Sequence, residues 1–210
     1  MRVLLGVVGL TLPALALAGE PARTLDATDL HRHVGAFVHA ELGAGYLQSE
    51  PGGPGAVSGP TVSFGLSVGG AVTENWILAA ELSGNIAPEA GVSGVPNLNA
   101  EVGLAFFGAG LRHYFMPINI FVALAPGATV LSRNGDLGNG HTRLGWGLKF
   151  SAGKEWWVSE CWAVGLAAYA LVSFNEDPPE QNTPGAGGGL GPPITWTSIG
   201  AGVVATLSFH

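Results

Sequence analysis

The sequence has few charged residues and, after its first twenty positions, no long apolar segment. Charged residues make up 11% of the 210 positions, whereas hydrophobic residues make up 47%. No uninterrupted apolar run beyond residue 20 reaches the roughly 18 residues that a membrane-spanning helix needs. The 34 glycines also oppose helices and suit a tightly curved sheet. This composition argues against a helical membrane protein and favours a β protein.

Basic residues and cysteines are also scarce. The formal net charge is −7 and no basic cluster exists, so nucleic acid is not expected as a partner. The single cysteine, Cys161, excludes an intramolecular disulfide, and we interpret it as a small apolar side chain rather than a nucleophile. His31 and His33 would lie on one side of a strand, but no third ligand is evident. We therefore predict neither a metal nor another cofactor.

The first residues have the pattern of an export signal. Arg2 precedes an apolar segment, and Ala16-Leu17-Ala18 forms a small-x-small cleavage site. We therefore predict a signal peptide over residues 1–18. Residues 19–33 are polar and not periodic, and they are expected to form a periplasmic lead-in.

The clearest periodicity lies between Leu144 and Phe174. Every second residue from Leu144 to Ala152 is apolar, and the residues between them are small or polar. A second alternating run starts at Trp162, and folding the chain about Ser159 places Trp156 opposite Trp162 and Phe150 opposite Ala168. Both arms exceed ten residues and carry aromatic residues at their ends, as in transmembrane β-barrels, whose strands need about 9–11 residues. The alternative is a soluble β-sandwich, whose strands usually have about 5–6 residues.

The same alternation predicts eight strands within residues 34–210, which we take as one barrel domain. The expected strands are 34–46, 62–69, 76–85, 100–115, 118–130, 144–157, 162–174 and 194–209. Connections are short after the second, fourth and sixth strands. They are longer and rich in Gly and Pro at 49–60, 87–99, 133–141 and 175–193. This asymmetry is typical of barrels with short periplasmic turns and longer external loops.

One expected strand, 100–115, breaks the pattern, because its apolar positions change parity between Phe106 and Leu111. A β-bulge at 108–110 would restore an outward apolar face. Alternatively, the first half of this strand turns its apolar side chains into the interior. In the next strand Pro126 lacks a ladder donor and predicts a local kink or a bulge.

Two segments carry a family resemblance. Gly110-Leu111-Arg112-His113-Tyr114-Phe115 is similar to a strand ending common in small outer-membrane barrels, and Phe209 is similar to their C-terminal aromatic signal, although His210 follows it. The chain thus resembles the OmpA/OmpX/OmpW-like group. The resemblance implies an all-β, eight-stranded antiparallel up-and-down transmembrane barrel in the bacterial outer membrane. It also implies contact with outer-membrane lipid, insertion by the barrel-assembly machinery and a monomeric state.

The two faces of the predicted wall supply the candidate site residues. Charged groups inside a dry barrel must pair, because an isolated buried charge is very costly. We therefore predict a lumen charge network among the inward-facing Glu41, Glu81, Lys149, Arg143, Arg112 and His39. Outward-facing aromatic residues near strand ends are expected at the membrane interfaces: Trp76, Trp146, Trp156, Trp162, Phe174 and Phe209.

Three functions are compatible with such a barrel. An interior of eight strands is just wide enough for side chains to fill, so a mostly filled lumen with a structural or loop-mediated interaction role is expected. A narrow passive channel for small solutes is the alternative, and a continuous void would favour it. A lipid-modifying enzyme is the third; the six His are scattered without a His-x-Ser pair, so no catalytic residue is predicted. A Ser–His–acid contact at the membrane rim would favour that enzyme. The loops indicate no specific ligand.

Overall fold

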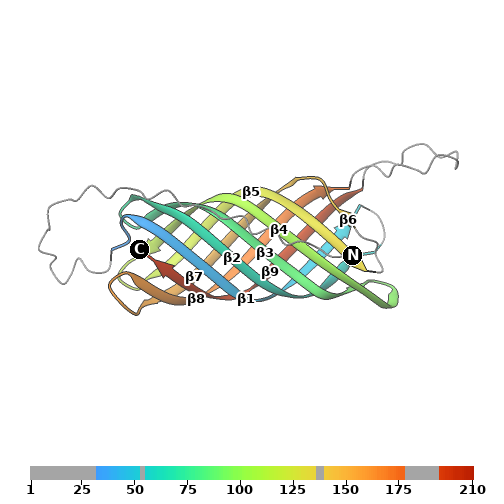
Figure 1. Cartoon of the computed structure of the whole chain (residues 1–210), viewed down its shortest axis with the longest axis horizontal. Coiled ribbons are helices and arrows are strands. Elements are labelled where there is room, and N and C mark those ends of the chain that lie inside the picture. The colour runs from blue at the N-terminus through green and yellow to red at the C-terminus, as the bar shows by residue number, and fades with distance from the viewer. Residues whose placement is uncertain (1–31, 53–54, 136–139, 178–193) are drawn as a thin grey trace, which may run out of the picture. The chain divides into compact units, whose positions relative to one another are not determined.

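Long antiparallel strands make up almost all of the computed structural model, which describes residues 32–52, 55–135, 140–177 and 194–210 (Figure 1). The predicted signal peptide and all but the end of the predicted lead-in lie outside these residues. Within the described ranges, no helix is long and apolar enough to cross a membrane. The strands are β1 Ala36–Pro51, β2 Val57–Thr73, β3 Trp76–Val92, β4 Val95–Phe115, β5 Ile120–Gly135, β6 Gly140–His141, β7 Gly145–Trp157, β8 Trp162–Glu176 and β9 Thr195–Phe209.

Eight of these strands form a closed ring. Each long strand pairs antiparallel with its neighbour in the order β1-β2-β3-β4-β5-β7-β8-β9, and β9 pairs with β1. The two-residue β6 pairs only with the end of β5. Closure leaves no long strand with a free edge. The predicted fold class, an eight-stranded antiparallel up-and-down β-barrel, is confirmed.

Exposure alternates along the strands as the sequence predicts. Leu148 and Phe150 of β7 are 42% and 48% exposed, whereas Lys149 between them is 3% exposed. The outward residues of all eight long strands are mainly apolar, and we call their exposed side chains the apolar band. It includes Leu42, Leu66, Leu82, Phe107, Leu124, Leu148, Leu166 and Val203.

The β7–β8 hairpin has the predicted faces but a different register. Phe150 lies opposite Ala170 and Trp156 opposite Val164, so the predicted pairing is wrong by two residues. The turn spans residues 158–161, where the amides of Val158 and Ser159 both donate to the carbonyl of Trp162 (2.9 and 3.2 Å). A shift of two residues leaves every side chain on its own face, because side chains in a strand repeat every two residues. The alternation therefore cannot distinguish the two registers.

The change of parity in β4 arises because the first half of this strand turns its apolar side chains into the lumen, not because of a bulge. β3 and β4 pair in one register from Trp76–His113 to Ala87–Val102, so the predicted bulge at 108–110 is wrong. The first half of β4 turns apolar side chains inward, and Val102, Leu104 and Phe106 are each at most 2% exposed. Arg112 and Tyr114 share this inward parity. In β5, Pro126 produces no bulge: β4 and β5 pair at Gly108–Gly127 and again at Leu111–Leu124 in one register.

Two of the predicted long loops are mostly strand. β1 continues to Pro51, and β3 and β4 extend to a tight turn at Ser93-Gly94, where Gly94 has a φ of +84°. Pro60 and Pro88 lie where the pairing is irregular, because the β2–β3 register shifts between Ser58 and Val62 and the β3–β4 register shifts between Ala87 and Ala90. Pro51 is the last residue of β1. Proline is tolerated at such bulges, since its missing N–H interrupts no regular ladder.

The three predicted short turns are confirmed and lie at one end of the ring, at residues 74–75, 116–119 and 158–161. We call this the short-turn end and the opposite one the loop end. Asn75 and Asn119 in two of these turns have φ values of 64° and 53°, a left-handed conformation that asparagine adopts more readily than most residues.

Candidate functional site in the barrel lumen

Three charged side chains meet near the middle of the lumen, and we call them the Lys149 cluster. The ammonium of Lys149 on β7 forms ion pairs with the carboxylates of Glu41 on β1 and Glu81 on β3, the latter at 2.5 Å. The three side chains are 3%, 8% and 11% exposed. Because β7 is not adjacent to β1 or β3 in the ring, these ion pairs cross the lumen.

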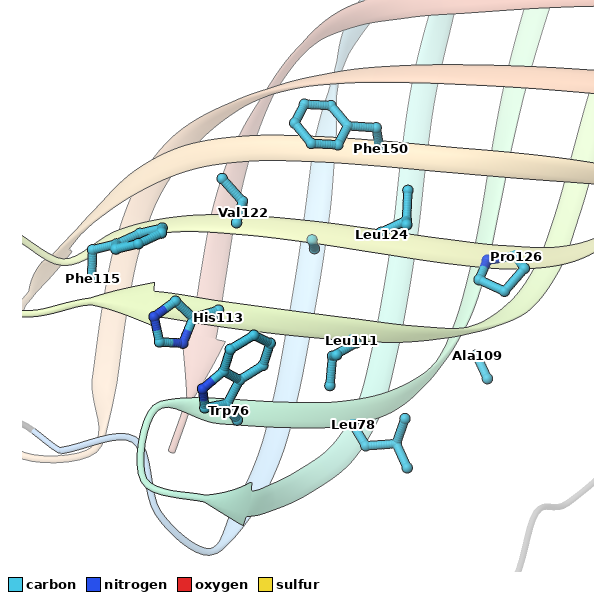
Figure 2. Close-up of a pocket in the computed structure, with 11 residues that line it drawn as sticks. Trp76, Leu78, Ala109, Leu111, His113, Phe115, Val122, Leu124, Pro126 and Phe150 are labelled. Atoms are coloured by element: carbon cyan, nitrogen blue, oxygen red, sulfur yellow. The ribbon is translucent and has the colours of Figure 1, made fainter.

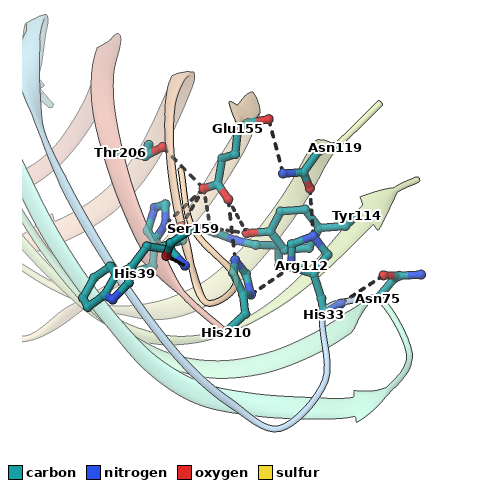
Figure 3. A network of polar contacts seen from close by, with 12 residues as sticks. His33, His39, Asn75, Arg112, Tyr114, Asn119, Glu155, Ser159, Thr206 and His210 are labelled. Carbon is teal, nitrogen blue, oxygen red and sulfur yellow. Dashed lines mark hydrogen bonds and ion pairs between the residues drawn. The ribbon is translucent and has the colours of Figure 1, made fainter. Parts of the chain in front are cut away.

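A second group, the Glu155 cluster, lies towards the short-turn end and consists of Glu155, Arg112, His39, Tyr114 and Ser208. Figure 3 labels the first four of these residues. The carboxylate of Glu155 accepts hydrogen bonds from the Ser208 hydroxyl (2.7 Å) and the Tyr114 hydroxyl (3.1 Å). Arg112 Nη1 lies 2.9 Å from His39 Nδ1 and 4.0 Å from Glu155 Oε1. The polar groups of four strands, β1, β4, β7 and β9, are thereby joined in one buried network.

The two groups are also connected to each other. His39 Nε2 lies 3.8 Å from Glu41 Oε2, and His39 Nδ1 lies 3.5 Å from Glu155 Oε1. The imidazole of His39 therefore lies between one acid of each cluster. Arg112 also stacks over the rings of Phe121 and Phe37, with its Cζ 4.3 and 5.1 Å from their centroids.

Two histidines from outside the strands close the short-turn end. His33 Nδ1 lies 2.8 Å from His210 Nδ1, and His33 Nε2 lies 2.7 Å from the Asn119 side-chain oxygen. The ring of His33 stacks on Tyr114 with centroids 3.6 Å apart. Burial, aided by the neighbouring His210, lowers the pKa of His33 to about 4, and burial also lowers the pKa of His210. We therefore expect both imidazoles to be neutral at pH 7. His33, at the end of the predicted lead-in, is buried and fills the short-turn end of the lumen.

The structure brings most of the predicted network residues together and leaves one out. Glu41, Glu81 and Lys149 form one cluster, and Arg112 and His39 belong to the other. Arg143 is exposed, and its placement in the lumen is wrong. Its strand begins only at Gly145, and the amide of Arg143 instead donates to the carbonyl of Glu176 (2.7 Å).

Sequence reasoning missed the central acid of the second cluster. Glu155 has the same parity in β7 as Lys149, so extending the alternation to the end of that strand would have placed it inside. His33 and His210 carry no such signal, because both lie beyond the strand ends. Among the residues that the structure describes, no group of three His, Cys, Asp or Glu side chains could hold a metal ion.

Apolar side chains fill the lumen around the charged clusters. Towards the loop end, a buried apolar layer contains Leu47, Leu104, Phe106, Leu131 and Leu171. Towards the short-turn end, another contains Phe37, Ile77, Phe121 and Val204.

The gaps between these layers are small. A gap beside Lys149 and Tyr169 leaves no room for a water molecule, and another between Phe37, Glu81 and Arg112 measures about 10 Å³. A single water needs about 10–15 Å³. Neither of these two gaps between described residues therefore has room for a chain of water molecules.

One contact between buried or partly buried side chains lies towards the loop end. The carboxylate of Asp177 accepts hydrogen bonds from Arg133 Nη2 (2.7 Å) and Trp196 Nε1 (2.9 Å). The guanidinium of Arg133 lies 4.6 Å from the centroid of the Trp196 ring. This contact ties the ends of β5 and β9 to the residue that follows β8.

One Ser–His–acid contact is present, but it lies inside the barrel. Ser208 Oγ is 2.8 Å from His39 Nδ1, and Glu155 lies beside both. None of the three residues is more than 1% exposed, so no lipid at the membrane rim can reach them. The Ser208 hydroxyl also donates to Glu155 at 2.7 Å, which leaves His39 no proton to accept from it. This contact is a packing arrangement of buried polar groups.

The six predicted interface aromatics face outward at two levels. Trp76, Trp156, Trp162 and Phe209 lie towards the short-turn end, and Trp162 packs against Phe209 with centroids 5.3 Å apart. Trp146 and Phe174 lie towards the loop end and stack at 4.5 Å. The apolar band lies between these two levels.

No protein-family model and no curated protein matches the chain. Solved structures do match the chain. Neisserial surface protein A is 14% identical, with a TM-score of 0.51 over 83% of this chain and 96% of that one. The outer membrane protein OprG from Pseudomonas aeruginosa is 12% identical, with a TM-score of 0.49 over 86% and 99%. The outer membrane protein AlkL, solved in lipid bilayers, is 14% identical, with a TM-score of 0.49 over 91% and 94%. The similarity to Neisserial surface protein A shows that the chain has the fold of small eight-stranded outer-membrane β-barrels, as the sequence resemblance implies.

Proposed function

We propose that the protein is an integral barrel of the bacterial outer membrane, with a closed lumen and a structural or loop-presenting role. The apolar band supports membrane insertion, because large side chains such as Leu42 and Val203 are 63% and 58% exposed around a closed ring. Lipid is the environment in which such a surface is stable, and aromatic residues at both levels suit the two interfaces. The barrel-assembly machinery would insert the chain, and a ring without free edges can function as a monomer.

The filled lumen is the main observation that supports a non-conducting barrel. An ion crossing it would meet the Arg133–Asp177–Trp196 contact, two apolar layers, both charged clusters and finally the His33–His210 pair. Breaking a buried ion pair such as Lys149–Glu81 costs about 3–5 kcal/mol, because an uncompensated charge remains behind. A narrow passive channel would need a water path through these layers, so we place it second.

A permeability assay tests this proposal. The protein would be purified from membranes of cells that express the full chain, and its folding checked by a heat-modifiable shift on a gel. It would then be reconstituted into vesicles loaded with small sugars. We expect folded protein in the outer-membrane fraction and vesicles that swell no faster than protein-free ones. Rapid swelling with folded protein would establish the channel instead.

A further inference from the structure

The outer face of the barrel carries an open groove over β3, β4, β5 and β7 (Figure 2). Its volume is about 720 Å³, within the range of about 300–1,000 Å³ found for small-ligand sites. Its sides are formed by Leu111, Leu124 and Phe150. At one end it is lined by the short side chains of Ala109 and Pro126. The groove is part of the apolar band, so a ligand that occupies it must be soluble in the membrane.

The depth of the groove follows from the sequence of β4 and β5. Ala109 and Pro126 are short side chains between longer outward residues such as Phe107 and Leu148. The two strands pair at Gly108–Gly127 and at Leu111–Leu124, and the intervening residues include Pro126, which has no amide proton to donate. The outward side chains are therefore short at this place on the wall.

The other end of the groove is polar and aromatic. Here the ring of His113 lies between Trp76 and Phe115, with centroid distances of 4.3 and 4.6 Å. Figure 2 shows Trp76 and His113 side by side at this end. His113 Nδ1 has no hydrogen-bond partner among the described residues. This end lies at the short-turn level, where the headgroups of the periplasmic leaflet would be.

A lysine lies beside the same end. Phe115, which lines the groove, shares one row with Ile120 and Lys154 across β4, β5 and β7. Lys154 therefore lies two strands from Phe115, at the level of the groove mouth. Its ammonium donates to the carbonyl of Ile118 in the β4–β5 turn (2.5 Å) and lies 5.7 Å from the centroid of the Trp156 ring. A carbonyl neutralises no charge, so the ammonium can still attract an anion.

We propose that this groove binds one anionic glycerophospholipid of the periplasmic leaflet, with an acyl chain along Leu111 and Leu124 and the phosphate near Lys154. The site rests on the proposed membrane location, since only a membrane brings such a lipid to the wall. The apolar groove suits an acyl chain, and the ammonium of Lys154 at the level of its mouth suits the phosphate. A second copy of the chain would fill the apolar part but offers no reason for a lysine at its mouth.

Native mass spectrometry tests the site. The protein purified from membranes of cells expressing the full chain would be reconstituted in vesicles of equal parts phosphatidylcholine and phosphatidylglycerol, and then released into detergent. We expect one phosphatidylglycerol to remain per barrel. Lys154→Gln should reduce that retention about fivefold, the size of the attraction of one lysine to anionic lipid. Lys154→Arg should restore it.

A groove-filling variant separates a site from general lipid contact. Ala109→Phe should abolish retention of phosphatidylglycerol. Ala168→Phe, at an exposed outward alanine on β8, adds the same bulk away from the groove and should change nothing. Each variant must first show the heat-modifiable gel shift.

The remaining outcomes overturn the site. Equal retention of both lipids, or retention unchanged in Ala109→Phe, would mean ordinary annular lipid, and a mass of two chains would mean a dimer interface. If the wild-type protein is absent from the outer-membrane fraction, the proposed function fails together with the site. If it is present there without selective retention, only the site fails.

Discussion

Leu148 and Lys149 are neighbours in β7 that face opposite environments. Leu148 is 42% exposed on the apolar band, whereas Lys149 is 3% exposed and holds two carboxylates across the lumen. On the outside, any apolar side chain of suitable size serves equally well, because lipid adapts to it. On the inside, each polar atom needs a particular partner. The outer face is therefore fixed by composition and the inner face by pairing.

The largest expected loss of stability comes from a substitution on the inner face. Lys149→Met should leave Glu41 and Glu81 buried beside each other without a counter-charge, which costs about 3–5 kcal/mol. Urea unfolding of the protein in lipid vesicles measures this change. Lys154→Met, an outward lysine on the same strand, is the matched control and should have a much smaller effect. Equal stability of Lys149→Met and the wild type would show that the Lys149 cluster does not stabilise the barrel.

A slightly smaller loss of stability is expected from a substitution on the outer face. Leu148→Arg places a charge on the apolar band and should cost about 2–4 kcal/mol near the bilayer midplane. The same unfolding experiment measures it. Leu144→Arg changes an outward residue that precedes β7 and is 73% exposed, so it should be nearly neutral. If both variants are equally tolerated in bilayers, the outward surface of β7 does not lie in lipid.

The buried His33 at the short-turn end should make the unfolding free energy of the barrel depend on pH. The folded-state pKa of His33 is lowered to about 4 from 6.5, so protonation favours the unfolded state. Its contribution should be complete above pH 6.5 and be lost as the pH falls towards 4, by at most about 3 kcal/mol. Unfolding free energies measured across this range should flatten in His33→Gln. The exposed His141→Gln is the control, and identical slopes in all three proteins would contradict the expectation.

The smallest effect concerns the loop-end aromatic level. Trp146 and Phe174 stack at 4.5 Å, and such pairs are worth about 0.5–1.5 kcal/mol beyond their buried area. Trp146→Ala and Phe174→Ala should each lose this interaction, so the double variant should lose less than the sum of the two. A double-mutant cycle on unfolding free energies gives the coupling directly. Strict additivity would mean that the two rings do not stabilise each other.

The outer face could be predicted from the sequence almost completely. Period-two alternation alone places Trp146, Leu148 and Phe150 outward, and it fixes the strand number and the short turns. It does not fix the register, because a shift of two residues in β7–β8 leaves the pattern unchanged. It also ended the first strand at Tyr46 and began the second at Val62, whereas β1 continues to Pro51 and β2 begins at Val57. Proline opposes a regular ladder but is accepted at the irregular pairings near the loop end.

The inner face could be predicted only in part. The inward parity and the charges of Glu41, Glu81 and Lys149 are enough to predict the Lys149 cluster. Their pairing follows from the cost of isolated buried charge. The inward apolar half of β4 could not be separated from a bulge, because Phe106 and Leu111 have the same chemistry on opposite faces. His33 and His210 meet through contacts 177 residues apart in the sequence, and no local pattern signals such a contact.

The closed lumen is tested most directly by single-channel recording. The purified protein, folded by the heat-modifiable criterion, would be incorporated into planar bilayers beside its Lys149→Met variant. The side-chain layers predict that the wild-type protein is silent, with no discrete openings. Stable unitary openings of the wild-type protein would contradict this account and turn the two charged clusters into the lining of a conducting path.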